Sequence, residues 1–218
     1  MIFSKDQLRT LKNNIKLRLS EYRYIHTIGV KNVAIKIASF CYDGDISEIE
    51  AAALLHDISK EYSLEEQYDM IKKSQIHLTD TDMMSETVFH AFTAPVVICC
   101  DFNDFSTQNI LSSAFNHTTG DENMSLFDEI IFIADYVEEN RKHPNCIKVR
   151  DDLYRSFELS RNKEECVSHL HNATVQALDF TISHLLKNGN IINLRTVKTR
   201  NAFLGRLPML INDLQKGI

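Results

Sequence analysis

The chain has 218 residues, 44% of them hydrophobic, with six glycines and a formal net charge of −6 at pH 7. This length suits one domain, or at most two small ones, and is ample for a buried core. The scarcity of glycine and the lack of G-x-x-x-x-G-K and G-x-G-x-x-G motifs disfavour P-loop and Rossmann sites, and the negative charge disfavours nucleic-acid polymers as partners.

Two amphipathic helices are predicted at the start of the chain. Residues 4–19 alternate apolar and basic positions at helical spacing. Such a helix can contact membrane or nucleic acid, but a solvated basic face on a packed helix is the ordinary interpretation. Residues 21–41 form the second helix. His26 lies on its apolar face, four and seven residues before Val30 and Val33.

The pair His56-Asp57 ends a third predicted helix, for which Asp45 is the expected N-cap. His56 continues an apolar stripe that includes Ile49 and Ala53. An ionised Asp57 is costly to bury there unless a cationic group meets it. A metal ion would meet both residues, because imidazole nitrogen and carboxylate oxygen are ordinary ligands for Fe, Mn, Zn or Ni.

The middle of the chain adds three more polar residues on apolar helix faces. Ser63 begins a helix with a capping box, and residues 74–82 are expected to be a polar connection. Two short helices follow, one around His90 and one over 94–100. A helix over 108–117 ends at His117, where Gly120 suits a left-handed cap. A helix over 125–139 carries Asp135 on its apolar stripe.

Two long helices, about 146–160 and 163–187, are predicted to follow, then a short basic segment at 195–201 and a tail. There is no β-pattern, internal repeat or domain linker, so the sequence predicts a single all-α bundle over residues 1–218. Three further histidines match no ligand pattern and are expected to be surface or core residues: His169, His171 and His184.

The expected location is the cytoplasm. The five cysteines are odd in number and include no C-x-x-C, which is typical of reduced thiols. The first residues do not resemble a signal peptide, and no uncharged apolar run reaches about 18 residues. We therefore expect no membrane association.

Six residues with metal-ligand chemistry point into one predicted helical core. Any one of them alone is better explained as a satisfied buried residue, but all six need a common explanation. Six N/O ligands exceed one tetrahedral site and suit two metals. The six are His26, His56, Asp57, His90, His117 and Asp135.

The order of these ligands resembles the HD-domain pattern of metal-dependent phosphohydrolases. Within that superfamily the chain resembles the YqeK family of bacterial symmetrical dinucleoside-tetraphosphate hydrolases, from about residue 18 to 201. The segments that carry the resemblance are 23–30, 52–60, 117–120, 124–126 and 133–138. It implies an HD-type helical bundle, with a metal-binding core at 18–141 and C-terminal helices at 142–203 that complete it.

The family pattern also implies how the metals are held. One metal would be bound by His26, His56, Asp57 and Asp135, and the second by Asp57, His90 and His117, with Asp57 bridging. Resemblance implies iron, in a di-iron centre, whereas the ligand types leave Mn, Co, Ni and Zn open. Two metals can activate a water for in-line attack at phosphorus, so a metal-bound hydroxide is the expected nucleophile. The expected catalytic residues are Asp57, Lys60, His90 and His117.

Several further residues are candidates for phosphate contacts. Lys60 is either a phosphate ligand or a solvated lysine at a helix end, and the resemblance favours the first. Arg141 matches a family phosphate position, although Glu138-Glu-Asn-Arg141 lacks the usual proline. Likewise, Ala91-Phe92 replaces the Gly-Pro usual after the third histidine. The implied nucleotide-binding set is His26, Asp57, Lys60, His90, His117, Thr118, Asp135, Arg141, Arg195 and Arg200.

The leading functional prediction is hydrolysis of diadenosine tetraphosphate into two ADP. One alternative is an HD-type nucleotidase or alarmone phosphohydrolase, because the metal ligands do not discriminate between these substrates. A second is a catalytically silent nucleotide sensor, against which the complete ligand set argues. The expected partner is a small dinucleoside polyphosphate or an ADP-type nucleotide, with no nucleic-acid polymer and no membrane; a homodimer is left open.

Overall fold

The computed structural model describes residues 2–74 and 76–207. These residues form helices and connections without a strand, which confirms the all-α prediction. In chain order the elements are α1 (Lys5–Arg18), α2 (Glu21–Cys41), α3 (Ile46–Leu55), α4 (Leu64–Lys73), α5 (Asp80–Met83), the 3-10 turn η1 (Glu86–Val88), α6 (Phe89–Asp101), the 3-10 turn η2 (Asn103–Phe105), α7 (Gln108–Asn116), α8 (Leu126–Val137), α9 (Pro144–Leu159), α10 (Lys163–Lys187) and α11 (Leu194–Arg206).

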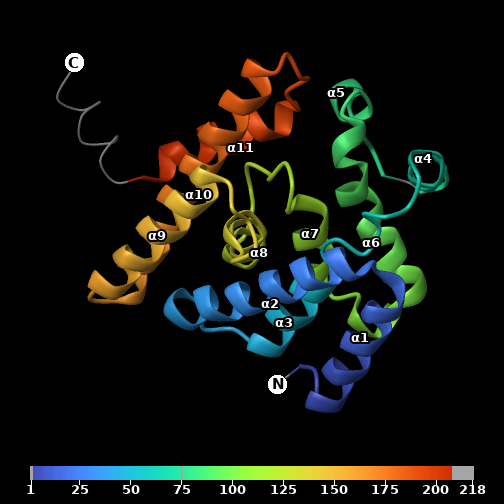
Figure 1. Ribbon diagram of the computed structural model, residues 1–218, viewed down its shortest axis with the longest axis horizontal. Helices are drawn as coiled ribbons and strands as arrows, with labels where there is room; N and C mark the ends of the chain where they lie inside the picture. Colours follow the sequence, from blue (N-terminus) through green and yellow to red (C-terminus); the bar gives the residue numbers. More distant parts are fainter. Residues whose placement is uncertain (1, 75, 208–218) are drawn as a thin grey trace.

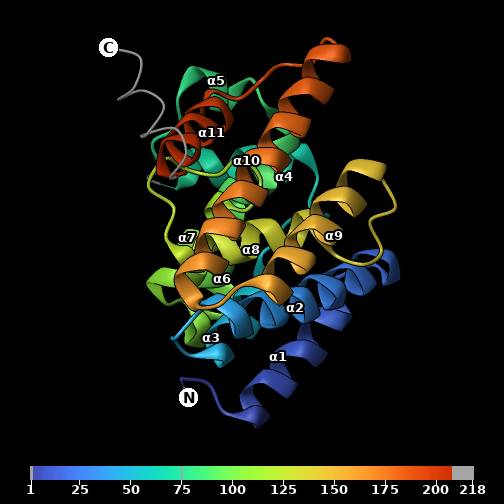
Figure 2. The same ribbon diagram turned by 90° about the vertical axis from the view of Figure 1, so that its left-hand side faces the viewer.

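Helix α8 forms the centre of the bundle. It packs against α2, α7 and α10, and it is seen end-on in the middle of Figure 1. Every residue from 127 to 134 is buried, as expected of a helix that is enclosed on all sides. Helices α9, α10 and α11 lie together on one side of α8, and α1 lies on the opposite side (Figures 1 and 2).

The N-terminal helix α1 has an apolar face of Leu8, Leu11 and Ile15 that is buried in the main core. It packs chiefly on α3, and its basic side chains Lys5 and Arg9 are exposed. The predicted solvated basic face is therefore observed. Among the described helices, none combines the length and apolarity needed to cross a membrane.

The predicted helix boundaries are mostly confirmed through their caps. The Asp45 side chain accepts a hydrogen bond from the Ser47 amide at the start of α3. Ser63 and Glu66 form the predicted capping box of α4, and Gly120 has a φ of 70°, as predicted for a left-handed cap after α7. The predicted polar connection at 74–82 is partly helical, because α5 begins inside it at Asp80.

The prediction of two short helices around His90 was wrong. Helix α6 is continuous through Pro95, although a proline inside a helix costs about 3 kcal/mol. Buried side chains lie on both sides of that position, including Phe92, Val97 and Ile98. Burying each stabilises the fold by roughly 1.5–3 kcal/mol, which outweighs the local cost.

The basic segment at 195–201 is also more ordered than predicted, because it is part of the helix α11. Thr196, Thr199 and Phe203 are buried at helical spacing on one face of α11, and this face packs against α10. Residues 208–218 of the predicted tail lie outside the described residues.

His171 is a half-buried residue with an acidic partner that the sequence did not indicate. Its Nδ1 lies 2.8 Å from Oε2 of Glu129, a fully buried residue on α8. Thr174 donates a second hydrogen bond to the same carboxylate. These contacts join α8 to α10 and give His171 a structural explanation.

Candidate metal centre

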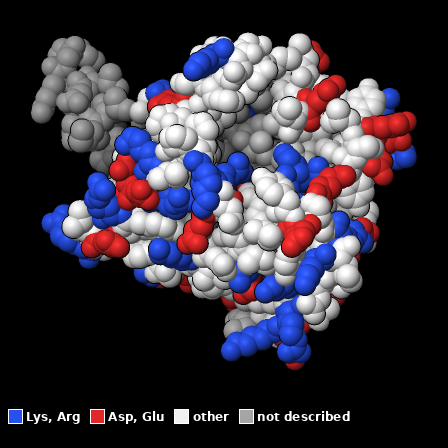
Figure 3. Space-filling view, in the orientation of Figure 1, with Lys and Arg blue, Asp and Glu red and all other residues white. Residues whose placement is uncertain are grey.

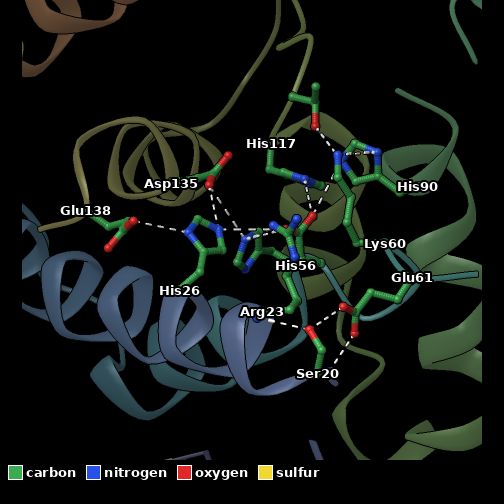
Figure 4. Close-up of polar contacts among 12 residues, drawn as sticks. Ser20, Arg23, His26, His56, Lys60, Glu61, His90, His117, Asp135 and Glu138 are labelled. Atoms are coloured by element: carbon green, nitrogen blue, oxygen red, sulfur yellow. Dashed lines mark hydrogen bonds and ion pairs between the residues drawn. The ribbon is translucent and has the colours of Figure 1, made fainter. Parts of the chain in front are cut away.

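The six predicted ligands come from five separate parts of the helical bundle and meet in one place (Figure 4). One lies on α2, one is the second residue of α6, and one is near the end of α8. The other three follow directly after helices α3 and α7. Five are buried and the Asp135 side chain is 17% exposed. The residue on α2 is His26, the one on α6 is His90 and the one on α8 is Asp135. His56 and Asp57 follow α3, and His117 follows α7.

Asp57 lies between two groups of ligands. Its Oδ2 is 3.7 Å from Nε2 of both His26 and His56. Its Oδ1 is 3.4 Å from Nε2 of His90 and 3.3 Å from Nε2 of His117. One carboxylate oxygen therefore faces each group, which is the arrangement that a bridging ligand requires.

Asp135 completes the first group. Its Oδ1 is 3.0 Å from Nε2 of His26 and 3.9 Å from Nε2 of His56. Among the described residues, three overlapping sets of three have their ligand atoms within 4.8 Å of one another: His26, His56 and Asp57; His56, His117 and Asp135; and Asp57, His90 and His117. A single ion of ordinary size can contact all the members of such a group.

Three of the imidazoles are oriented through their other nitrogen. Nδ1 of His56 donates to the Ala53 carbonyl at 2.8 Å, and Nδ1 of His117 donates to the Ala114 carbonyl at 2.7 Å. Nδ1 of His26 lies 3.3 Å from Oε1 of the buried Glu138. In a neutral ring, a protonated Nδ1 leaves Nε2 with a free lone pair, and here that lone pair faces the centre.

Several of these buried atoms have no hydrogen-bond partner among the residues that the structure describes. They include Nε2 of His26, His56 and His117 and Oδ1 of Asp57. Leaving such groups unsatisfied costs about 1–3 kcal/mol each. A divalent cation would satisfy all four, and a set of imidazoles and carboxylates suits Fe, Mn, Co, Ni or Zn better than Mg or Ca. The residues present therefore fit a metal centre.

The charges in the protein without metal also suit cation binding. Burial alone raises the pKa of a carboxyl group, but His56 and the other imidazoles hold the pKa of Asp57 well below its usual value. Arg141 outweighs the same burial effect and keeps the pKa of Asp135 low. Burial lowers the pKa of His56 to about 4. Near neutral pH the centre thus has two carboxylates and a neutral His56, as metal ligation requires.

His26 differs in its charge. Burial lowers its pKa, but the adjacent carboxylates of Asp135 and Glu138 outweigh that effect and raise the pKa to about 9. In the absence of metal, this imidazole is therefore protonated at neutral pH. Metal binding must release that proton, so affinity at this group of ligands depends on pH.

His90 has a different environment. Within the described part of the chain, no backbone carbonyl fixes its ring; instead the Lys60 ammonium nitrogen lies 3.0 Å from both Nδ1 and Nε2. Its Nε2 lies 3.1 Å from Oγ1 of Thr118. The structure thus brings Lys60 and Thr118 to the end of the centre that His90 occupies, and burial lowers the pKa of Lys60.

A cavity of about 790 Å³ opens over the centre and is lined by all the predicted ligands except His56. Four Lys and Arg side chains also line it: Arg23, Lys60, Arg141 and Lys142. Arg141 donates to the carbonyl and to Oδ1 of Asp135 at 2.8 and 2.7 Å. Figure 3 shows a hollow in this face of the molecule with Lys and Arg side chains at its edge.

Sequence reasoning missed two residues of the centre. Arg23 donates to Oδ2 of Asp57 at 2.6 Å, and its signal is its position three residues before His26, on the same helix face. Glu138 supports His26 and follows Asp135 by three residues. Neither matched a ligand pattern, because each acts through another residue.

The two predicted arginines of the C-terminal segment lie elsewhere. Arg195 contacts Asp82 and Asp121 at 3.2 and 3.3 Å and lines a separate cavity of about 260 Å³. Arg200 donates to Asp179 at 2.8 Å. Neither arginine lines the large cavity.

Comparison with known families and proteins is consistent with this geometry. Residues 23–140 match the HD domain, and this span contains all six ligands. A solved structure from Clostridium acetobutylicum, described as a predicted HD superfamily hydrolase involved in NAD metabolism, superposes with a TM-score of 0.78 at 25% identity. The match covers 94% of this chain and 98% of that one.

Three curated relatives are each named symmetrical bis(5'-nucleosyl)-tetraphosphatase. The protein from Halalkalibacterium halodurans is 32% identical over 190 residues, which cover 87% of this chain and 93% of the relative. The Staphylococcus aureus protein is 31% identical over 152 residues, 69% of this chain and 76% of the relative. The Bacillus subtilis protein is 29% identical over 189 residues, 86% of this chain and 92% of the relative.

Proposed function

The chain belongs to the HD-domain family, and we propose that it is a metal-dependent hydrolase that cleaves diadenosine tetraphosphate symmetrically into two ADP. The observation that carries this proposal is the convergence of six residues with metal-ligand chemistry beneath a cavity lined by cationic side chains. The names of the three relatives support the substrate class.

We assign one metal to His26, His56, Asp57 and Asp135, and a second to Asp57, His90 and His117. Iron is the proposed metal, in a di-iron centre, and Mn, Co, Ni and Zn suit the same ligands. When bound, two such ions supply Lewis-acid stabilisation and an activated water for displacement at phosphorus.

The surrounding side chains bind and orient the polyphosphate. Lys60 and Thr118 lie at the His90 end of the centre, where the Lys60 ammonium neutralises charge on the bond being cut and the Thr118 hydroxyl donates to a phosphate oxygen. Arg141 lies at the Asp135 end and has hydrogen-bonding capacity for a neighbouring phosphate. Cationic groups at both ends hold a chain of several phosphates across the metals. One ADP half is retained and the other ADP leaves.

Hydrolysis of diadenosine tetraphosphate in oxygen-18 water tests the proposal. The metal-loaded protein is expected to form ADP only, with half of the ADP molecules labelled on the terminal phosphate. ATP plus AMP would contradict symmetrical attack. Release of free phosphate from a mononucleotide at comparable efficiency would favour the nucleotidase alternative.

A further inference from the structure

The first turns of α2 form one wall of the large cavity. Tyr22 and Ile25 both line the cavity there. Because they are three residues apart, the two side chains share one side of the helix. We call this pair of side chains the α2 wall. The proposed metal chemistry uses neither of them, so their place in the cavity needs another explanation.

The α2 wall is apolar and largely exposed. Tyr22 is 78% exposed and Ile25 is 49% exposed. Single exposed apolar residues are ordinary on a protein surface, and Leu17, which is 87% exposed and does not line the cavity, is one of these. The α2 wall differs from Leu17, because its two side chains lie together in the cavity that contains the metal centre. Such a place suits a ligand group with apolar faces.

The start of α2 lies at the His90 end of the metal centre. The Ser20 amide, at the N-cap of α2, donates to Oε2 of Glu61 at 2.7 Å, and the Ser20 hydroxyl donates to Oε1. Glu61 directly follows Lys60, so these bonds hold the start of α2 beside that lysine. Figure 4 shows Ser20 and Glu61 on the side of the centre where Lys60 and His90 lie, with Glu138 on the opposite side.

The Tyr22 ring is open to a planar ligand. The guanidinium carbon of Arg23 lies over the ring, 5.9 Å from its centre. Arg23 is itself held by Asp57, to which it donates at 2.6 Å. Since most of Tyr22 is exposed, the ring retains surface on which a nucleobase can stack.

We propose that the α2 wall binds the base of the ADP half whose phosphates pass Lys60. This inference rests on the proposed function, in which the polyphosphate crosses the metals between Arg141 and Lys60. A dinucleotide carries a nucleoside beyond each end of its phosphates. Beyond Arg141 the cavity is walled by α9 and α10, whereas beside Lys60 the α2 wall offers an apolar surface. Tyr22 stacks on the base, and Ile25 adds an apolar contact.

The test measures binding to the full, metal-loaded chain by calorimetry. One probe is an analogue of diadenosine tetraphosphate in which a methylene group replaces the central bridging oxygen, so that the bond between the two halves resists hydrolysis. The other is inorganic tetraphosphate, which has the same number of phosphates and no base. Stacking of a base on an aromatic side chain corresponds to roughly a 5- to 150-fold change in affinity.

Tyr22→Ala is expected to weaken binding of the analogue about fivefold, at the low end of that range because Tyr22 is exposed. Binding of inorganic tetraphosphate should stay unchanged. Tyr22→Phe keeps the stacking surface and should bind the analogue as the wild type does. Ile25→Ala should weaken the analogue alone, by a smaller factor. Leu17→Ala is the matched control, because it removes an exposed apolar side chain outside the cavity.

The inference is overturned if Tyr22→Ala and Ile25→Ala both bind the analogue as tightly as the wild type. It is also overturned if the analogue and inorganic tetraphosphate lose affinity equally, since that result places the defect in the phosphate contacts. Either result leaves the proposed reaction standing if the wild type hydrolyses diadenosine tetraphosphate to ADP. If binding of the analogue depends on Tyr22 but the dinucleotide is not hydrolysed, the base site stands and the proposed reaction fails.

Discussion

Glu138 provides a sharp test of how the metal centre is held. The residue is 1% exposed, and its two oxygens have different partners. Oε1 faces Nδ1 of His26 at 3.3 Å, while Oε2 accepts from the Asn140 amide at 2.7 Å and from its side chain at 3.0 Å. Both positions require an acceptor. The substitution Glu138→Gln supplies only one, because the other position becomes an NH₂ donor.

The glutamine must therefore either give up the Asn140 amide or face His26 with a donor. In the second case the His26 hydrogen moves to Nε2, which then cannot bind metal in the neutral ring. Loss of such a supporting partner typically lowers metal affinity 10- to 100-fold, about 1.4–2.8 kcal/mol. The 3.3 Å distance to His26 is long for a hydrogen bond to a charged group, so we expect a loss of about tenfold.

The assay is competition for metal between the protein and a chelator of known affinity, with elemental analysis of the metal content. Glu139→Gln is the matched control, because Glu139 is the neighbouring residue and is exposed. Circular dichroism checks that the helices persist. Wild-type affinity in Glu138→Gln would refute the role of Glu138 in orienting His26.

Three further predictions concern the same structure. Asp57→Ala should lose both metals and all activity while helix content persists, whereas His117→Ala should retain about one metal per chain. Full metal content in Asp57→Ala, measured by elemental analysis, would contradict the proposal that Asp57 bridges two metals. Gly29→Ala places a Cβ 2.4 Å from Oε2 of Glu138, so it should lower metal affinity in the same chelator assay, and unchanged affinity would show that Glu138 moves freely. Despite burial, the hydrogen bond from the Thr79 amide and the other contacts of Asp82 keep its pKa below the ordinary 3.8. The contacts of the charged Asp82 carboxylate therefore stabilise the fold above about pH 4, and this stabilisation is lost as the pH falls through the folded-state pKa. The difference in the free energy of unfolding in urea between wild type and Asp82→Asn should thus shrink on acidification. A difference that grows would refute this sign.

The sequence predicted that the proposed metal ligands would meet, because these polar residues fall on or directly after the apolar face of a helix. His26 and Asp135 were found in this way, since helical periodicity alone indicates which residues face the core. Helical periodicity could not predict the position of Glu138, because this residue follows the end of α8 in a non-helical backbone conformation, with φ −57° and ψ 152°. Periodicity does not predict where a side chain points once the backbone leaves the helix. The signal that remained was its spacing of three residues from Asp135.

Long-range packing explains the other differences. The continuity of α6 through Pro95 depends on side chains buried by neighbouring helices, and local preference alone predicted a break. The part of the large cavity formed by α9 and α10 depends on how these two helices lie against each other. His143 and His184, which line it, therefore had no recognisable pattern of their own. In contrast, caps such as Ser63 depend on a few adjacent residues, and these were predicted correctly.

The helix ends around the centre add a field of their own. Helices α3 and α7 both finish one residue before a metal ligand, so the partly negative carbonyl ends of two peptide dipoles converge on the cation site. Helix α6 has the opposite polarity, because His90 is its second residue and the partly positive amide end lies on that side. The backbone alone therefore attracts cations to one part of the centre and anions to the side of His90. Under the proposed function, the same gradient favours cations at the proposed ligands and a polyphosphate beside Lys60.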